Sequence, residues 1–283
     1  MAEPCEHNGR VVLVHGRAAS METPVPFEAE WVAAARYGLK RVEYEHWECV
    51  RISMPFYGGI WRPDDLVDPP VFDPGRGRGE GVEVTFDLPD FGRAIEGFFE
   101  WVDRRTGGSG LVLDWILNDT REYLEKRDLR ERTDQEAIDA CQGDAEPVLV
   151  GFSMGSLVAY HLLVHASKDF RVKSFISCGS PMGDRAFRDR LARISPDGKL
   201  SFPGCLLMWA NIWNDDDPAT QEFELSKHYE RKGKGRGVQA QETRGREPGA
   251  LNPAAAHNPL DYLSSKALGS ALKTALEAAG STM

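Results

Sequence analysis

One stretch in the middle of the chain, from Val148 to Ser156, most constrains the fold. It reads Val-Leu-Val-Gly-Phe-Ser-Met-Gly-Ser, an apolar run followed by a serine between two glycines. The following segment, Leu157 to Val164, lacks glycine and proline and has the apolar spacing of a helix. We therefore expect a buried strand, a sharp turn at Ser153 and a helix, an order typical of sheets covered by helices.

The two glycines fit a turn that carries a reactive serine. Serine on a sharp strand-to-helix turn has strained backbone, and Gly151 and Gly155 leave room for strand and helix to pass closely. The Gly-x-Ser-x-Gly spacing is that of a nucleophile elbow and indicates a serine hydrolase with Ser153 as its nucleophile. The amide of Met154, at the start of the helix, would point toward an anion at the serine.

Composition agrees with an enzyme that binds neither nucleic acid nor membrane. The chain has 283 residues and a net charge of -10, which disfavours non-specific binding to nucleic acid or anionic lipid. No apolar run is long enough to span a bilayer, and the N-terminus lacks the pattern of a signal peptide. We expect a cytoplasmic protein without integral membrane association, folded as a single domain over residues 1–283.

The cysteines give no sign of a metal site. There are five, an odd number, and none forms a Cys-x-x-Cys pair. We expect reduced thiols, no zinc site and no cofactor. Their positions are Cys5, Cys49, Cys141, Cys178 and Cys205.

Strand and helix patterns alternate along the rest of the chain, which predicts an α/β fold with a mostly parallel sheet and helices on both faces. The expected strands lie near 10–14, 48–53, 148–152, 172–178, 205–212 and, weakly, 238. The further expected helices lie near 27–36, 91–102, 111–124, 134–141 and 259–279. Residues 62–110 interrupt this order, beginning with a stretch rich in proline, glycine and aspartate. Long loops of this kind are functional lids or disordered segments, so we interpret 62–110 as an insertion that forms a possible lid or cap.

A serine needs a base to take its proton, and four histidines follow Ser153. His161 and His165 lie four apart on the helix after the serine, where packed or solvated side chains are the first interpretation and a metal pair the second. His228 lies at the end of an expected helix. His257 lies in a loop after the last strand, the place from which a base reaches the serine, and we therefore predict it as the base.

The third member is expected among three adjacent acids, Asp215 to Asp217, at the end of a strand. Asp217, just before Pro218, is our first candidate to orient the histidine, and Asp215 the second. The same acids also suit a turn and a helix N-cap. The oxyanion would bind the amides of Met154 and of Arg17, which follows His15 and Gly16.

Several aromatic residues fall near the expected site. They favour an acyl or aromatic group as substrate, and they are equally suited to a buried core. These candidate substrate-binding residues are Phe56, Tyr57, Trp61 and Phe152.

Together these motifs resemble the α/β-hydrolase superfamily, in particular its lipase- and esterase-like members. The resemblance rests on His15-Gly16, the segment Gly151 to Gly155, Asp217-Pro218 and His257. It implies that Ser153 is the nucleophile, His257 the general base and acid, and Asp217 its orienting acid, with Met154 and Arg17 as oxyanion donors. Because few residues precede the His-Gly strand, we expect the family's usual first strands to be missing and the sheet to have about six.

The resemblance implies acyl transfer through an acyl-enzyme on Ser153, with a small-molecule acyl ester or thioester as substrate. Cleavage of a carboxylic ester or related acyl bond is the first hypothesis. An acyltransferase or thioesterase acting on a carrier-bound acyl group is the second. A non-catalytic, hydrolase-like binding or scaffold protein is the third.

Overall fold

The computed structural model describes residues 9–16, 24–61, 120–143, 145–167, 170–220, 223–229, 238–242 and 256–280. The expected insertion at 62–110 lies outside these residues, and the single-domain organisation over 1–283 therefore stays a prediction.

The centre of the described fold is a six-stranded sheet in which every pairing is parallel. Its strand order is β2-β1-β3-β4-β5-β6, with Val12 opposite Leu149 and Gly151 opposite Ser177. This confirms the predicted parallel sheet of about six strands. The strands are β1 (Arg10–Val14), β2 (Arg51–Ser53), β3 (Val148–Phe152), β4 (Ser174–Cys178), β5 (Met208–Trp213) and β6 (Gln239–Glu242).

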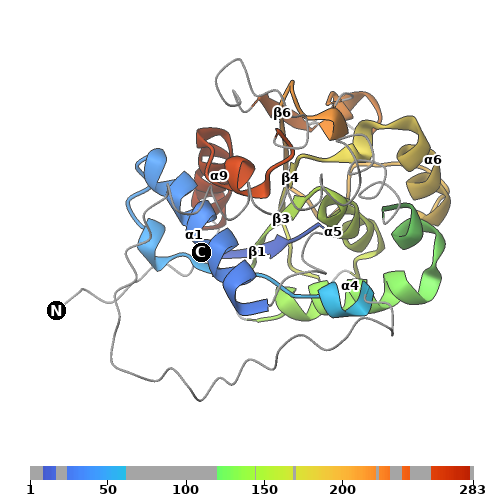
Figure 1. The fold of residues 1–283 in the computed structure, drawn as a ribbon, viewed down its shortest axis with the longest axis horizontal. Helices are drawn as coiled ribbons and strands as arrows, with labels where there is room; N and C mark the ends of the chain where they lie inside the picture. Colours follow the sequence, from blue (N-terminus) through green and yellow to red (C-terminus); the bar gives the residue numbers. More distant parts are fainter. Residues whose placement is uncertain are drawn as a thin grey trace, which may run out of the picture.

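Helices cover both faces of the sheet, as the sequence predicted (Figure 1). Successive side chains of a strand point to opposite faces, so Val12 and Val14 join one core while Val11 and Leu13 join the other. The first core lies under α4 (Arg127–Cys141), α5 (Met154–His165) and α6 (Arg185–Ile194). The second lies under α1 (Pro24–Arg41), α8 (Pro259–Leu263) and α9 (Lys266–Gly280).

The C-terminal segment forms two helices, α8 and α9, where the sequence predicted one. Ser265 separates them, because its hydroxyl donates to the carbonyl of Tyr262 at 2.7 Å and accepts from the amide of Leu268 at 3.1 Å, which caps α9. Helix α1 crosses this break closely, and a Cβ on Gly38 would lie 2.6 Å from the carbonyl oxygen of Leu263. The apolar periodicity runs through the break, and it therefore concealed the cap.

Among the described residues, short 3-10 helices are found at two expected elements, the strand at 48–53 and the helix before His228, and at three other places. The strand predicted at 48–53 is reduced to β2 and is preceded by η2 (Trp47–Cys49). The other 3-10 helices are η3 (Gly58–Trp61), η4 (Pro181–Gly183), η5 (Pro218–Thr220) and η6 (Leu225–Lys227). Within the described ranges, no helix has both the length and the apolar character needed to cross a bilayer.

The prediction of reduced thiols is wrong for Cys49, which is disulfide-bonded. Cys141, Cys178 and Cys205 are free. Counting and local spacing cannot detect a pair whose members are brought together only by the fold, so this bond could not be predicted from the sequence.

Candidate active site

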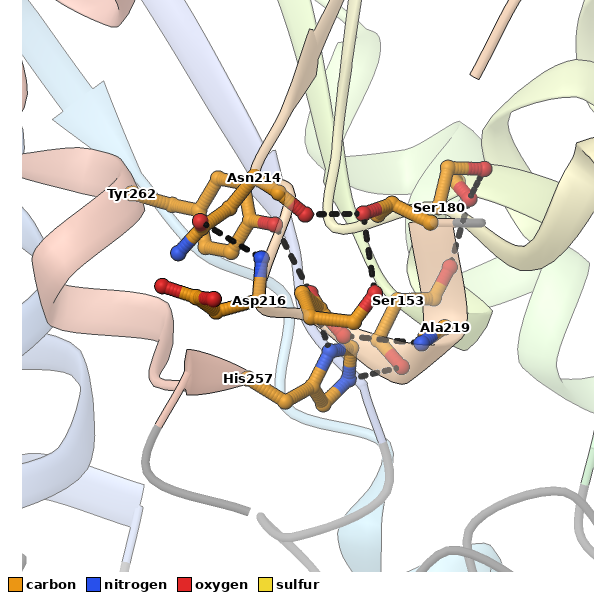
Figure 2. A network of polar contacts seen from close by, with 10 residues as sticks. Ser153, Ser180, Asn214, Asp216, Ala219, His257 and Tyr262 are labelled. Carbon is orange, nitrogen blue, oxygen red and sulfur yellow. Dashed lines mark hydrogen bonds and ion pairs between the residues drawn. The ribbon is translucent and has the colours of Figure 1, made fainter. Parts of the chain in front are cut away.

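The link from β3 to α5 is a sharp turn at Ser153. Its backbone dihedral angles are φ 53° and ψ -126°, a region that residues with a Cβ rarely adopt. The turn is tied to the next strand, because the amide of Ser153 donates to the carbonyl of Cys178 at 2.9 Å. On the following turn the hydroxyl of Ser156 donates to the carbonyl of Ser153 at 2.5 Å and contacts the hydroxyl of Ser180 at 2.6 Å (Figure 2).

Both glycines of the elbow are required by close backbone contacts. A Cβ on Gly151 would lie 2.6 Å from the carbonyl oxygen of Gly155. A Cβ on Gly155 would lie 2.6 Å from the carbonyl oxygen of His15, and closer still to that of Val14. The glycines on both sides of Ser153 are therefore needed because a larger residue would collide with the backbone, as expected from the sequence.

A chain of hydrogen bonds runs from the serine through a histidine to an acid (Figure 2). Nε2 of His257 lies 2.9 Å from Oγ of Ser153, and Nδ1 of His257 lies 2.8 Å from Oδ2 of Asp217. All three side chains lie in the protein interior, with Asp217 only 1% exposed. Because a carboxylate only accepts, Nδ1 carries the proton and Nε2 is free to accept from the serine hydroxyl.

The loop after β5 presents Asp217 rather than its neighbours to the histidine. Asp215 and Asp216 are exposed at the surface. Oδ1 of Asp217 accepts from the amide of Ala219 at 2.9 Å, which holds the carboxylate at the start of η5. Its other oxygen, Oδ2, accepts from the hydroxyl of Tyr262 at 2.7 Å as well as from His257. The structure thus brings the first candidate acid to His257, and not the second.

Comparison with protein families adds one decisive observation. The model of the alpha/beta hydrolase family matches residues 11–259, from β1 to the helix that follows His257. The chain is a member of the α/β-hydrolase family. No curated protein gives a significant match. Membership indicates a hydrolase-type function, and this α/β-hydrolase has its Ser, Asp and His in the order that the elbow predicted.

The end of β1 lies directly against the serine of this α/β-hydrolase. A Cβ on Gly16 would lie 3.2 Å from Cβ of Ser153 and 3.6 Å from its Oγ. Met154 opens α5, and the first amides of a helix have no partner within it, so its N–H is suitably placed for an oxyanion. Arg17, the other predicted oxyanion donor, lies outside the described residues.

The strand end beside the serine is held by His15, which is fully buried. Its Nδ1 lies 2.6 Å from the carbonyl oxygen of Gly16, and the amide of Tyr57 donates to its Nε2 at 3.3 Å. Burial lowers the pKa of His15 to about 4, against the smaller opposing effect of the Gly16 hydrogen bond. The ring is therefore neutral near pH 7, with its proton on Nδ1 and directed at Gly16.

The four aromatic candidates differ in their contacts. The ring of Phe152 packs between those of His257 and Tyr262, at centroid distances of 4.8 and 5.6 Å. Tyr57 is 1% exposed and binds His15, the contacts of a core residue. Phe56 is partly buried against the second core. The side chain of Trp61 lies outside the described part of the molecule. For Tyr57, the contacts fit the second interpretation of these aromatic residues, packing in a buried core.

The other histidines downstream of the serine lie apart from this hydrogen-bonded chain. His161 binds the buried Asp134 of α4, with Nδ1 2.9 Å from Oδ2, and His165 lies 2.7 Å from the carbonyl oxygen of Ile194. His228 contacts Arg188. In the ranges that the structure describes, no group of three or more potential metal ligands comes together.

The sequence did not predict the structural roles of two residues of the site, His15 and Tyr262. His15 was noted as part of a motif, but its burial against Tyr57 depends on a contact across the fold. Tyr262 is not among the candidate residues that the sequence pointed to. Its position five residues after His257 was the one available signal that its side chain reaches the same acid.

Proposed function

We propose that this α/β-hydrolase is a serine hydrolase that cleaves a carboxylic ester or related acyl bond through an acyl-enzyme on Ser153. The observation that carries the proposal is the buried, hydrogen-bonded chain from Ser153 through His257 to Asp217. An ordinary serine hydroxyl is a weak nucleophile, and an adjacent base oriented by a carboxylate is what activates it.

In the proposed reaction, Oγ of Ser153 attacks the acyl carbonyl carbon while its proton passes to Nε2 of His257. The imidazolium that results has its positive charge beside the carboxylate of Asp217, which stabilises it. His257 then gives the proton to the leaving group as the bond to the acyl carbon breaks. Water repeats the sequence in the second half: His257 takes its proton, the acyl group leaves as the acid, and Ser153 regains its hydrogen.

The negative charge on the carbonyl oxygen needs preorganised donors. The amide of Met154 is available at the start of α5, and the closeness of Gly16 to Ser153 supports Arg17 as the source of the second. Loss of one such donor costs about 3 kcal/mol of transition-state stabilisation in comparable sites. We propose an acyl ester or thioester as substrate, with the ring of Phe152 beside His257 at the apolar wall of the site.

Labelling with a fluorophosphonate followed by intact-mass measurement tests the proposal, because this reagent reacts with activated serines. The wild type is expected to gain one adduct and Ser153→Ala none. Ser270→Ala is the matched control, since Ser270 is exposed on α9 and apart from the site; it is expected to be labelled like the wild type.

A folded wild type that gains no adduct would contradict the proposal and favour a binding or scaffold role. If labelling succeeds, hydrolysis of acyl esters with and without added alcohols or thiols distinguishes a hydrolase from an acyltransferase. A hydrolase releases free acid at a rate that the added acceptor leaves nearly unchanged. Dominant transfer to the acceptor would identify the second hypothesis instead.

A further inference from the structure

Oδ2 of Asp217 receives two side-chain donors. Nδ1 of His257 lies 2.8 Å from this oxygen, and the hydroxyl of Tyr262 lies 2.7 Å from it. The amide of Ala219 donates to the other oxygen, Oδ1. A triad of serine, histidine and acid requires only the contact with the histidine. The bond from Tyr262 to the same oxygen is therefore an additional feature of this chain that the proposed reaction does not use.

Tyr262 is fixed as a donor in this contact. Its side chain is 1% exposed. Burial raises the pKa of its hydroxyl far above the ordinary value, and the negative charge of Asp217 raises it further. The hydroxyl thus keeps its proton at neutral pH, and the carboxylate is its acceptor.

The backbone places Tyr262 for this role. Asn258, next to His257, caps α8, because its side chain accepts from the amide of Leu260 at 3.0 Å. Tyr262 lies one turn further along the same short helix, and its ring packs on Phe152. A single segment therefore contributes both side chains to Asp217: His257 lies just before the N-cap of α8, and Tyr262 lies within this helix (Figure 2).

We propose that Tyr262 is a positioning residue for the Ser153–His257–Asp217 site, which holds the carboxylate in place and weakens its attraction for a proton on His257. This inference rests on the proposed function. The hydroxyl dipole stabilises Asp217 most when the carboxylate carries its charge alone, beside a neutral imidazole. When His257 is protonated, the carboxylate is already neutralised by the ion pair, and the hydrogen bond contributes less.

The direction of the effect follows from that difference. Removal of the hydroxyl destabilises the state with neutral His257 more than the state with protonated His257. Protonation of His257 then becomes easier, and its titration moves to higher pH. Hydrogen bonds to charged groups contribute enough to move the midpoint by about one pH unit.

The remaining titratable groups near this carboxylate do not replace Tyr262. Cys178, at the end of β4, is fully buried, and burial raises the pKa of its thiol well above the ordinary value and keeps it neutral. Asp215 and Asp216 lie on the same loop and are exposed, so solvent screens their charges. His257 itself is the group whose titration is measured.

The test is an NMR titration of histidine-labelled protein, with His257→Gln used to assign the signal. Tyr262→Phe is compared with wild type and with Tyr160→Phe. The control also removes a buried hydroxyl from a hydrogen bond, here with the carbonyl of Ser201 at 2.9 Å and away from the acid. We expect the His257 midpoint to rise by about one pH unit in Tyr262→Phe only. In the same variant the acid limb of the pH profile for fluorophosphonate labelling should move to higher pH, with the labelling rate on that limb lowered by up to about tenfold.

The titration tests the role of Tyr262, whereas the labelling tests the proposed reaction of Ser153. An unchanged His257 midpoint in a folded Tyr262→Phe protein would overturn the positioning role, even if labelling became slower, because lost packing alone lowers the rate without moving the titration. An equal shift in Tyr160→Phe would overturn it too. A shift confined to Tyr262→Phe in a protein that no fluorophosphonate labels would support the role of Tyr262 and reject the proposed reaction.

Discussion

The ring of Tyr57 lies flat against the imidazole of His15, with ring centroids 3.8 Å apart and planes 18° from parallel. Tyr57 also donates its amide to Nε2 of this histidine and its hydroxyl to the carbonyl of the same residue. A protonated ring would lose the acceptor at Nε2, and burial disfavours its positive charge. The hydrogen bond from the amide of Tyr57 to Nε2, beside the strand end that contacts Ser153, therefore forms only while His15 is neutral.

Stability should consequently fall in acid. The pKa of His15 is lowered to about 4 in the folded protein from an ordinary value of 6.5, so the unfolded chain binds the proton more readily. The contribution of the neutral ring is fully present above pH 6.5 and is lost as the pH falls from 6.5 to 4. Denaturant unfolding across this range should show a loss of about 3 kcal/mol from this residue.

The variant His15→Asn removes the titrating ring and should lower stability at pH 8 but flatten the decline between pH 6.5 and 4. His165→Asn is the matched control, since His165 also lies within hydrogen-bond distance of a backbone carbonyl but is exposed. It should retain most of the decline. An equally steep curve in His15→Asn would show that another group dominates the acid transition.

The strands and the elbow were predictable because their signals are local. An apolar run before Gly151, and a helix pattern after Gly155, state the order of strand, turn and helix within one short segment. The contacts of Tyr57 with His15, and of Tyr262 with Asp217, join residues more than forty positions apart. No periodicity within a segment encodes such pairs, so these supports of the site appear only in the folded chain.

Substitution of Asp217 and of its neighbour Asp215 tests which of the two acids orients His257. Asp217→Asn keeps the size of the side chain but replaces the charge that stabilises the imidazolium, so turnover of an ester should fall on the order of 10⁴-fold. Asp215→Asn changes an exposed side chain and should leave turnover unaltered. Ser153→Ala and His257→Ala should each be more damaging than the Asp217 change. The assignment of the acid is wrong if the Asp215 variant proves the less active of the two.

Close packing behind the serine predicts an intolerance to a single methyl group. A Cβ on Gly155 would meet the carbonyl oxygens of Val14 and His15, which belong to the backbone of the adjacent strand and its end and cannot turn away. Gly155→Ala should lose about 3 kcal/mol of unfolding free energy. Gly204→Ala, where a Cβ would have no neighbour within 4 Å, should unfold at the wild-type midpoint. Thermal melts of the two variants decide this, and equal melting temperatures would contradict the packing seen at the elbow.

A second acid–histidine pair has a structural role on the face of the sheet that α4 and α5 cover. Asp134 of α4 accepts from the hydroxyl of Tyr123 at 2.6 Å and contacts Nδ1 of His161 on α5 at 2.9 Å. Asp134→Ala leaves both groups without this acceptor and should lower the unfolding free energy by about 2 kcal/mol. Labelling of Ser153 in the folded fraction should stay as in the wild type. Asp139→Ala, an exposed change on the same helix, should have little effect on either measurement.

The helices at the end of the chain mark the limit of pattern-based prediction. A continuous apolar spacing predicted one helix over 259–279, yet the cap at Ser265 divides it. Serine is equally acceptable on a helix surface and at a cap, and which of these it adopts depends on the segment that packs against it. Here α1 crosses at Gly38, and the break leaves Tyr262 on a separate short helix with its hydroxyl on Asp217.

The backbone of Ser153 predicts a trade between stability and activity. Its φ of 53° with ψ of -126° strains any residue that has a Cβ, at about 1 to 3 kcal/mol, whereas glycine adopts this conformation freely. Ser153→Gly and Ser153→Ala both remove the hydroxyl and its hydrogen bond to His257, so both should lack turnover and labelling. Only the glycine variant relieves the strain.

After subtraction of the extra entropy of glycine in the unfolded chain, Ser153→Gly should be about 1 kcal/mol more stable than Ser153→Ala. Chemical denaturation of the two inactive variants at pH 8, where His15 is neutral in both the folded and the unfolded states, isolates the backbone effect. A glycine variant no more stable than the alanine variant would mean that the turn stores no strain. The difference, if found, measures the free energy that this fold gives up to expose the serine at a sharp turn.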